Sequence, residues 1–176
     1  MLKIFKTQDG FTLIEIISVL VVLGILTVVA VSRMTNYDIE VRTGADALKA
    51  HLCYAQTVAM NYSPNAGEDT VWGIKSNDGT SYWLFKGTSI NDPHFLPDDS
   101  KYVASDGKIN LTAKKIKLNA GFTIYYDNHG IPYTAYTDST PTGNTPLAGD
   151  LTIVVTPLSG SPSQNITITP LTGFIQ

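Results

Sequence analysis

The stretch that decides the fold is residues 9–32, DGFTLIEIISVLVVLGILTVVAVS. From position 11 to position 32 it carries a single charged side chain, that of Glu15. A helix needs about 20 predominantly apolar residues to cross the hydrocarbon layer of a bilayer. An ionised residue inside such a helix costs at least ~2.5 kcal/mol even on lenient insertion scales. We therefore treat Glu15 as a candidate functional residue.

Two ordinary explanations of this segment are incomplete. A cleaved secretory signal fits the basic residues Lys3 and Lys6. The apolar run is too long for such a signal, however, and its end, Thr27–Ser32, has no A-x-A cleavage pattern. A plain signal anchor explains the length and places the basic N-terminus in the cytoplasm. It leaves the charge of Glu15 unexplained.

A third explanation accounts for that charge. If the chain is cut between Gly10 and Phe11, the new α-amino group of Phe11 lies four residues before Glu15 and on the same face of a helix. A carboxylate in the first turn also suits the helix dipole. Alternatively, each charge is matched by its opposite on a neighbouring copy. In either case a buried pair is far less unfavourable than a buried single charge.

The hexapeptide Gly10-Phe11-Thr12-Leu13-Ile14-Glu15, after a short basic leader and before an apolar helix, resembles the processing motif of type IV prepilins and pseudopilins. The resemblance implies that residues 1–10 are a leader peptide and that prepilin peptidase cleaves after Gly10. It also implies N-methylation of Phe11 and a role for Glu15 in subunit docking.

Two positions depart from the family pattern. Asp9 stands where these leaders usually end in a basic residue, and Ser32 replaces the helix-breaking proline of many members, whereas Gly24 is retained.

The helix is predicted to continue beyond the bilayer, over 11–62 in total, with a transmembrane part at about 11–32. Apolar residues recur there at helical spacing, which predicts one core-facing stripe. The stripe consists of Met34, Tyr37, Val41, Ala45, Leu48, Leu52, Ala55, Ala59 and Tyr62. Pro64 and Gly67 are predicted to end the helix.

Residues 63–176 are predicted to form an antiparallel β domain of six or seven short strands. Asn77-Asp78-Gly79 between two apolar runs indicates a hairpin. The alternation after Lys108 changes phase at Lys114-Lys115, which indicates a bulge or a turn. Further alternating runs begin at Phe122, Leu151 and Ile166, and Thr137–Gly149 is predicted to be a loop. The predicted class is α+β, with a long N-terminal helix packed on an antiparallel sheet or sandwich.

The C-terminal half is similar to the GspH/FimT group of minor pseudopilins and minor pilins. The similarity covers Ala47–Asn61, the turn Tyr126-Asp127-Asn128-His129-Gly130 and the tail Ile166–Ile175. It implies a domain outside the inner membrane and a filament built with other pilins on an inner-membrane assembly platform.

Catalysis and cofactor binding are not expected. His51, His94 and His129 are scattered, and His51 and Cys53, two residues apart, are predicted to point to different helix faces. Asp98, Asp99 and Asp106 could bind calcium, as some pseudopilins do, but a solvated acidic loop is the preferred interpretation. No metal site is predicted.

Nucleic-acid binding is also not favoured. The formal net charge is −3, with 12 Lys and Arg against 15 Asp and Glu. Five lysines fall within 17 positions, Lys101, Lys108, Lys114, Lys115 and Lys117, and we interpret them as a solvated face. No Lys or Arg occurs from Leu118 to Gln176, so the arginine-bearing C-terminal end of a DNA-uptake minor pilin is missing.

The sequence therefore predicts a minor pilin or pseudopilin, a single-pass inner-membrane precursor with a cytoplasmic leader and a periplasmic C-terminal domain. After cleavage it would join a surface pilus or a periplasmic secretion pseudopilus; before assembly, membrane lipid surrounds its helix. The alternatives are a membrane-anchored periplasmic binding module that does not polymerise and a DNA-uptake minor pilin.

Overall fold

A computed structural model describes residues 11–62, 71–97, 103–137, 143–159 and 161–176, and within 32–37 it describes the backbone only. The chain divides into two compact units, Met1–Asn36 and Tyr37–Gln176. The helix α1 runs from Leu13 to Asn61 and contributes to both units. Pro64 and Gly67, the predicted helix stop, lie outside the described residues.

Nine strands follow α1 in the described residues. They are β1 (Trp72–Ser76), β2 (Ser81–Lys86), β3 (Ile109–Asn110), β4 (Ile116–Leu118), β5 (Phe122–Tyr126), β6 (Pro132–Ala135), β7 (Thr145–Pro146), β8 (Leu151–Pro157) and β9 (Gln164–Ile168). One sheet has the order β3-β2-β1-β5-β6-β7 and the other has the order β4-β8-β9. All pairings within them are antiparallel.

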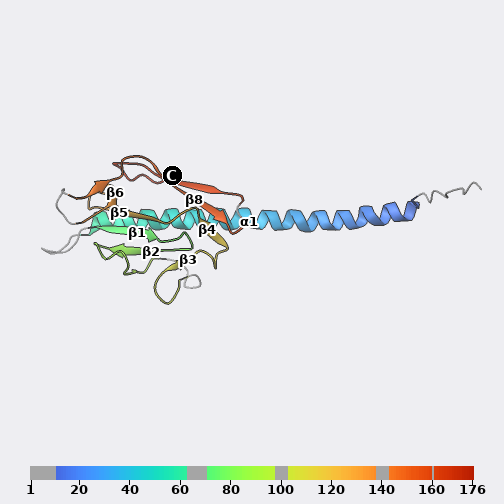
Figure 1. Cartoon of the computed structure of the whole chain (residues 1–176), viewed down its shortest axis with the longest axis horizontal. Coiled ribbons are helices and arrows are strands. Elements are labelled where there is room, and N and C mark those ends of the chain that lie inside the picture. The colour runs from blue at the N-terminus through green and yellow to red at the C-terminus, as the bar shows by residue number, and fades with distance from the viewer. Residues whose placement is uncertain (1–10, 63–70, 98–102, 138–142, 160) are drawn as a thin grey trace, which may run out of the picture. The chain divides into compact units, whose positions relative to one another are not determined.

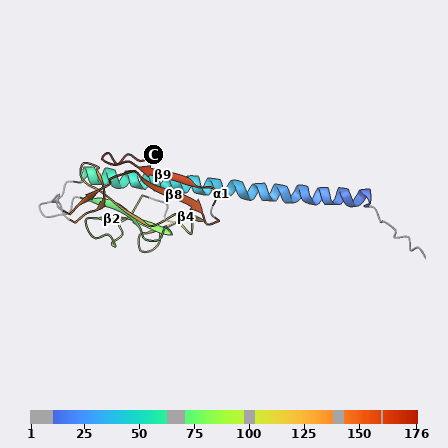
Figure 2. The same ribbon diagram turned by 45° about the horizontal axis from the view of Figure 1, so that its top comes forward.

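The helical segment from Asp38 to Asn61 lies among these strands (Figures 1 and 2). Its buried side chains recur every three or four residues and share the main core with residues of both sheets. They are Val41, Ala45, Leu48, Leu52, Ala55 and Ala59, each at most 2% exposed. The predicted apolar stripe is confirmed for these six, whereas the side chains of Met34 and Tyr37 are not described. The α+β prediction is confirmed.

The predicted hairpin is present between β1 and β2, with Trp72 opposite Lys86 and Lys75 opposite Trp83. Gly79 has a φ of 80°, a backbone conformation that glycine adopts without steric cost. The carboxylate of Asp78 accepts hydrogen bonds from the amide and the hydroxyl of Thr80. These bonds, the backbone one first, hold the pKa of Asp78 below its ordinary value.

The predicted change of phase at Lys114-Lys115 is a turn that takes the chain from one sheet to the other. β3 belongs to the six-stranded sheet and β4 to the three-stranded sheet. Leu111 and Ile116, on either side of the turn, are both buried, and Lys115 has a φ of 60°. The turn separates β3 from β4, so the apolar alternation restarts after it.

Two details of the β prediction were wrong. Thr137–Gly149 is not entirely loop, because β7 lies within it and pairs with β6. β6 itself was not expected, and the described residues hold nine strands where six or seven were predicted. Both strands are short and lack a clear apolar alternation; their pairing partners, rather than their own pattern, make them strands.

A second, aromatic-rich cluster covers the outer face of the six-stranded sheet. Alternation along β2 sends Tyr82 and Leu84 into the main core and Trp83 and Phe85 into this cluster. The Trp83 indole nitrogen donates a hydrogen bond to the Ile90 carbonyl at 3.0 Å. The strand β2 is thus buried on both faces of the sheet.

Candidate functional site

The first turn of α1 is capped by Thr12. The backbone amide of Glu15 donates to the Thr12 hydroxyl at 3.3 Å and to the Thr12 carbonyl at 3.1 Å. Threonine before the helix and glutamate at its third position form the sequence pattern of a capping box. Sequence reasoning missed this role of Thr12, although the Thr-x-x-Glu spacing was there to find.

The helical segment Leu13–Val31 is long and apolar enough to cross a membrane, with a mean hydropathy of 2.8, and none of it is buried inside the structure. Its hydroxyls are satisfied within the helix. Ser18 donates to the Ile14 carbonyl at 2.8 Å and Thr27 to the Leu23 carbonyl at 2.7 Å. Such internal bonds suit a helix in an apolar medium, where no water is available for polar groups.

Phe11 and Glu15 line one open groove on this segment, together with Ile16, Val19 and Leu20. The Phe11 side chain is 81% exposed. Apart from the carboxylate, the groove offers apolar surface. The structure thus brings Phe11 and Glu15 to one face of the chain's N-terminal end, while Gly10 lies outside the described residues.

Residues 5–31 match the family model described as the prokaryotic N-terminal methylation motif. The N-terminal segment is that of a type IV pilin-like protein. The matched range includes Gly10, Phe11 and Glu15, and the motif implies cleavage by prepilin peptidase and assembly with other pilins. No curated protein and no solved structure matches the chain significantly.

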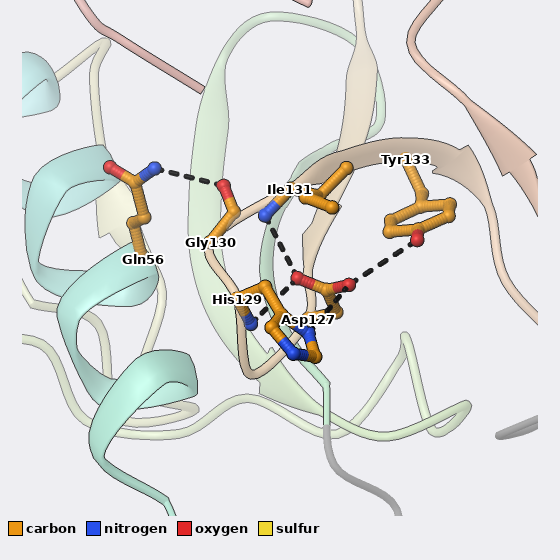
Figure 3. Close-up of polar contacts among 6 residues, drawn as sticks. All are labelled: Gln56, Asp127, His129, Gly130, Ile131 and Tyr133. Carbon is orange, nitrogen blue, oxygen red and sulfur yellow. Dashed lines mark hydrogen bonds and ion pairs between the residues drawn. The ribbon is translucent and has the colours of Figure 1, made fainter. Parts of the chain in front are cut away.

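The β domain of this type IV pilin-like chain carries a second polar constellation in the turn after β5 (Figure 3). The Asp127 carboxylate accepts hydrogen bonds from the amides of His129 and Ile131, at 2.9 and 2.8 Å. The Tyr133 hydroxyl donates to the same carboxylate at 3.3 Å. Burial, and then the charge of Asp127, raises the pKa of Tyr133. These are the contacts of a turn closed by the Asp127 carboxylate, and they place His129 beside that carboxylate.

Gln56 fastens this turn to α1. Its side-chain nitrogen donates to the Gly130 carbonyl at 2.9 Å and to the Thr172 carbonyl at 3.0 Å. Gly130 and Gly173 have φ values of 77° and 61°. A Cβ on Gly173 would lie 2.7 Å from the Gly130 oxygen, so the two turns approach as closely as glycine allows. We call these four residues, Gln56, Gly130, Thr172 and Gly173, the clasp.

The remaining candidates are not brought together. His51 is buried, with Nδ1 2.8 Å from the Tyr82 hydroxyl, whereas Cys53 is exposed, so the prediction of different faces is confirmed. His94 stacks edge-on against Trp72, with ring centroids 5.2 Å apart. The three histidines thus have separate neighbours.

Of the three acidic residues considered as calcium ligands, the structure describes Asp106 alone. Asp106 is held by the Lys108 ammonium at 2.6 Å, and this hydrogen bond holds the pKa of Asp106 below its ordinary value. Asp98 and Asp99 lie outside the described residues. Within the described residues no group of three or more His, Cys, Asp or Glu side chains could hold a metal ion.

The five lysines between positions 101 and 117 do not share one place in the fold. Lys108 lies next to β3 beside Asp106, whereas Lys114, Lys115 and Lys117 lie at β4 in the other sheet. Lys101 lies outside the described residues. The described lysines therefore do not follow one strand.

Proposed function

We propose that this chain is a minor pilin or pseudopilin, a structural subunit of a type IV pilus or of a type II secretion pseudopilus. In this role prepilin peptidase removes residues 1–10 and methylates Phe11, and the mature chain enters the filament through its N-terminal helix. The role is non-catalytic and needs no cofactor. Membership of the GspH/FimT group is part of the proposal and rests on the Asp127 turn and the C-terminal residues described above.

The observation that carries the proposal is the carboxylate of Glu15 near the start of the apolar helical segment Leu13–Val31, none of which is buried. A lone membrane anchor does not require a charge there. A packed array of such helices buries the groove of Phe11 and Glu15, and the α-amino group of Phe11 then neutralises the carboxylate. Cleavage at the methylation motif creates that amino group. The motif and the charge of Glu15 therefore support the same function.

The basic leader supports the orientation. Lys3 and Lys6 precede the apolar segment, and positive residues favour the cytoplasmic side. The β domain then lies in the periplasm before assembly. A binding module that never polymerises would share this orientation but would keep its leader.

Cleavage tests the proposal directly. The full chain is co-expressed with a prepilin peptidase, purified from membranes and weighed by intact mass spectrometry. We expect a chain that begins at N-methylated Phe11, and a Gly10→Val variant that stays full length, because a side chain there blocks access of the protease to the backbone. A wild-type chain that still begins at Met1 contradicts the proposal.

A further inference from the structure

A small polar groove lies beside β2 and β3, at one edge of the six-stranded sheet (Figure 1). Its volume is about 320 Å³. Pockets for small molecules begin at about 300 Å³, so the groove has room for a small ligand. Six of the seven side chains that line it are polar or charged. The lining residues are Thr80, Ser81, Ala104, Asp106, Lys108, Asn110 and Thr112.

The pairing of β2 with β3 brings two of these side chains together. Ser81 lies opposite Asn110, and Tyr82 lies opposite Ile109. Tyr82 and Ile109 belong to the main core. Because successive side chains of a strand point to opposite faces, Ser81 and Asn110 point to the outer face of the sheet. The floor of the groove therefore belongs to two paired strands, which hold it rigid.

A turn beside β3 forms one wall of the groove. The Ala104 amide donates to the Lys108 carbonyl at 2.8 Å, and the Gly107 amide donates to the Ala104 carbonyl at 2.9 Å. Within this turn the Lys108 ammonium donates to the Asp106 carboxylate at 2.6 Å. The same ammonium lies over the indole ring of Trp83, 5.1 Å from the ring centroid. Lys108 is thus held by two neighbours, which fixes the wall.

The charges of the lining cancel. The lining holds one carboxylate and one ammonium, and these two groups are paired with each other. An anion would compete with Asp106 for that ammonium. A divalent metal ion binds through several carboxylate and carbonyl oxygens, whereas one carboxylate lines the groove. The groove therefore favours a neutral ligand.

Three polar groups of the lining have no hydrogen-bond partner in the part of the chain that the structure describes. They are the hydroxyls of Ser81 and Thr112 and the side-chain nitrogen of Asn110. The side-chain oxygen of Asn110 accepts from the Ala113 amide at 3.0 Å, which orients the nitrogen. A hydroxyl both donates and accepts, and an amide nitrogen donates. All three side chains are short, so ordering them around a ligand costs little conformational entropy.

We propose that this groove binds one sugar unit of a neutral carbohydrate. A sugar ring carries several hydroxyls that donate and accept, which matches the three unused groups. The paired Asp106 and Lys108 add an acceptor and a donor at fixed positions. Trp83 is 2% exposed and gives the sugar no ring to stack on, so we expect weak binding, with a Kd in the millimolar range. The inference concerns the β domain and depends neither on cleavage nor on assembly.

The experiment uses the full chain, isotopically labelled and held in lauryldimethylamine oxide micelles, which contain neither sugar nor phosphate. Two-dimensional NMR spectra follow its backbone amides during titration with the methyl glycosides of glucose, galactose, mannose and N-acetylglucosamine. We expect saturable shifts of the groove amides with at least one glycoside and none with glycerol, which has hydroxyls but no ring. No saturable shift with any glycoside, or equal shifts with glycerol, overturns the inference. So do groove shifts that sodium phosphate or calcium chloride causes and the glycosides do not.

Matched variants locate the binding. Ser81→Ala with Thr112→Val removes two hydroxyls that make no internal hydrogen bond, so the spectrum should still be that of a folded chain. Affinity should fall about fivefold or more, because each lost neutral hydrogen bond costs roughly two- to tenfold. The control, Thr152→Val with Ser163→Ala, removes two exposed hydroxyls on or beside the strands of the other sheet and should keep the affinity of the wild type.

Equal affinity of the two double variants overturns the inference. If the first double variant does not fold, Thr112→Val alone applies the same test, because Thr112 is exposed after β3. An unchanged affinity of that single variant, together with unchanged glycoside shifts at Ser81 and Asn110, likewise overturns the inference.

Discussion

The side-chain amide of Gln56 donates to the carbonyl oxygen of Gly130 at 2.9 Å, across 74 positions of sequence. The same nitrogen reaches the Thr172 carbonyl at 3.0 Å. One helix side chain thus holds both the turn after β5 and the turn after β9. We therefore expect the clasp to stabilise the β domain, and this effect can be measured independently of filament assembly.

Replacing Gln56 with leucine should destabilise the β domain by about 1–2 kcal/mol, because two carbonyl oxygens lose their donor. The measurement is the free energy of unfolding from urea titration followed by tryptophan fluorescence. Gln164→Leu is the control, since Gln164 is exposed on β9. If both variants unfold at the same urea concentration, the clasp contributes nothing to stability.

Alanine at the two clasp glycines should give unequal losses. Both have positive φ, which costs about 1–2 kcal/mol for a residue with a Cβ. At Gly130 the nearest atom is the flexible Met60 sulfur, at 2.9 Å, whereas at Gly173 it is the Gln56 amide nitrogen at 2.6 Å, followed by a backbone oxygen at 2.7 Å. Gly173→Ala should therefore cost about 1–3 kcal/mol more, since overpacking adds to strain.

Gly149 provides the control for this pair, because a Cβ there has no atom within 4 Å. Gly149→Ala should change the unfolding free energy by at most about 0.5 kcal/mol. A Gly173→Ala variant as stable as Gly149→Ala would show that the turn relaxes freely away from Gly130.

Glu15→Gln separates charge pairing from helix capping. Glutamine serves a capping box as glutamate does, but it carries no charge. If Glu15 pairs with the Phe11 amine in a filament, both Glu15→Leu and Glu15→Gln remove the charge. Both variants should then be incorporated poorly, and to the same extent. Loss of one partner of a buried ion pair costs about 3–5 kcal/mol, because the other charge stays uncompensated.

The readout is the amount of subunit in sheared filaments relative to its amount in membranes. Thr12→Ala is the complementary variant, since it removes the cap at a cost of about 1 kcal/mol and leaves the charge. It should be incorporated nearly normally. Normal incorporation of Glu15→Gln, together with poor incorporation of Thr12→Ala, would assign Glu15 to capping alone.

A chain without residues 1–33 should be soluble and folded. The second compact unit begins at Tyr37 and contains the main core, to which α1 contributes its buried stripe. We expect a cooperative thermal transition followed by circular dichroism. Cys53→Ser should change it little, because Cys53 is exposed. Aggregation or a non-cooperative transition would show that the domain needs its N-terminal segment.

Stability should fall in alkaline solution because of Tyr126. Its hydroxyl is buried without a hydrogen-bond partner among the described residues, and burial raises its pKa far above the ordinary value. The folded state therefore keeps a proton that the unfolded chain loses above about pH 10. Stability from this difference is complete below that pH and is lost as the pH rises.

Tyr126→Phe should weaken this dependence. At neutral pH the variant should be as stable as the wild type or more so, because it removes an unsatisfied buried hydroxyl. Urea unfolding of the truncated domain between neutral pH and about pH 11 measures both effects. An unchanged alkaline slope would show that other tyrosines, such as Tyr125 and Tyr133, govern it.

The sequence by itself determined the features that depend on local pattern. The apolar run after Phe11 decides that this segment is a helix fit for a membrane, because length and composition alone set that requirement. The spacing of apolar residues by three and four determined which side of α1 is buried. Asn77-Asp78-Gly79 determined the first hairpin, because the tight turn itself requires a residue with positive φ and Gly79 provides it.

Only the tertiary structure decided the features that depend on distant partners. β6 and β7 are too short for a pattern of their own and are strands because each has a neighbour in register. The pattern at Lys114-Lys115 allows a bulge or a turn, and the pairing of β4 with β8 in the other sheet decides for a turn. The sequence does not distinguish Gln56 from other polar residues of the helix. Its partners, Gly130 and Thr172, lie 74 and 116 positions away, and only the folded chain brings them to it.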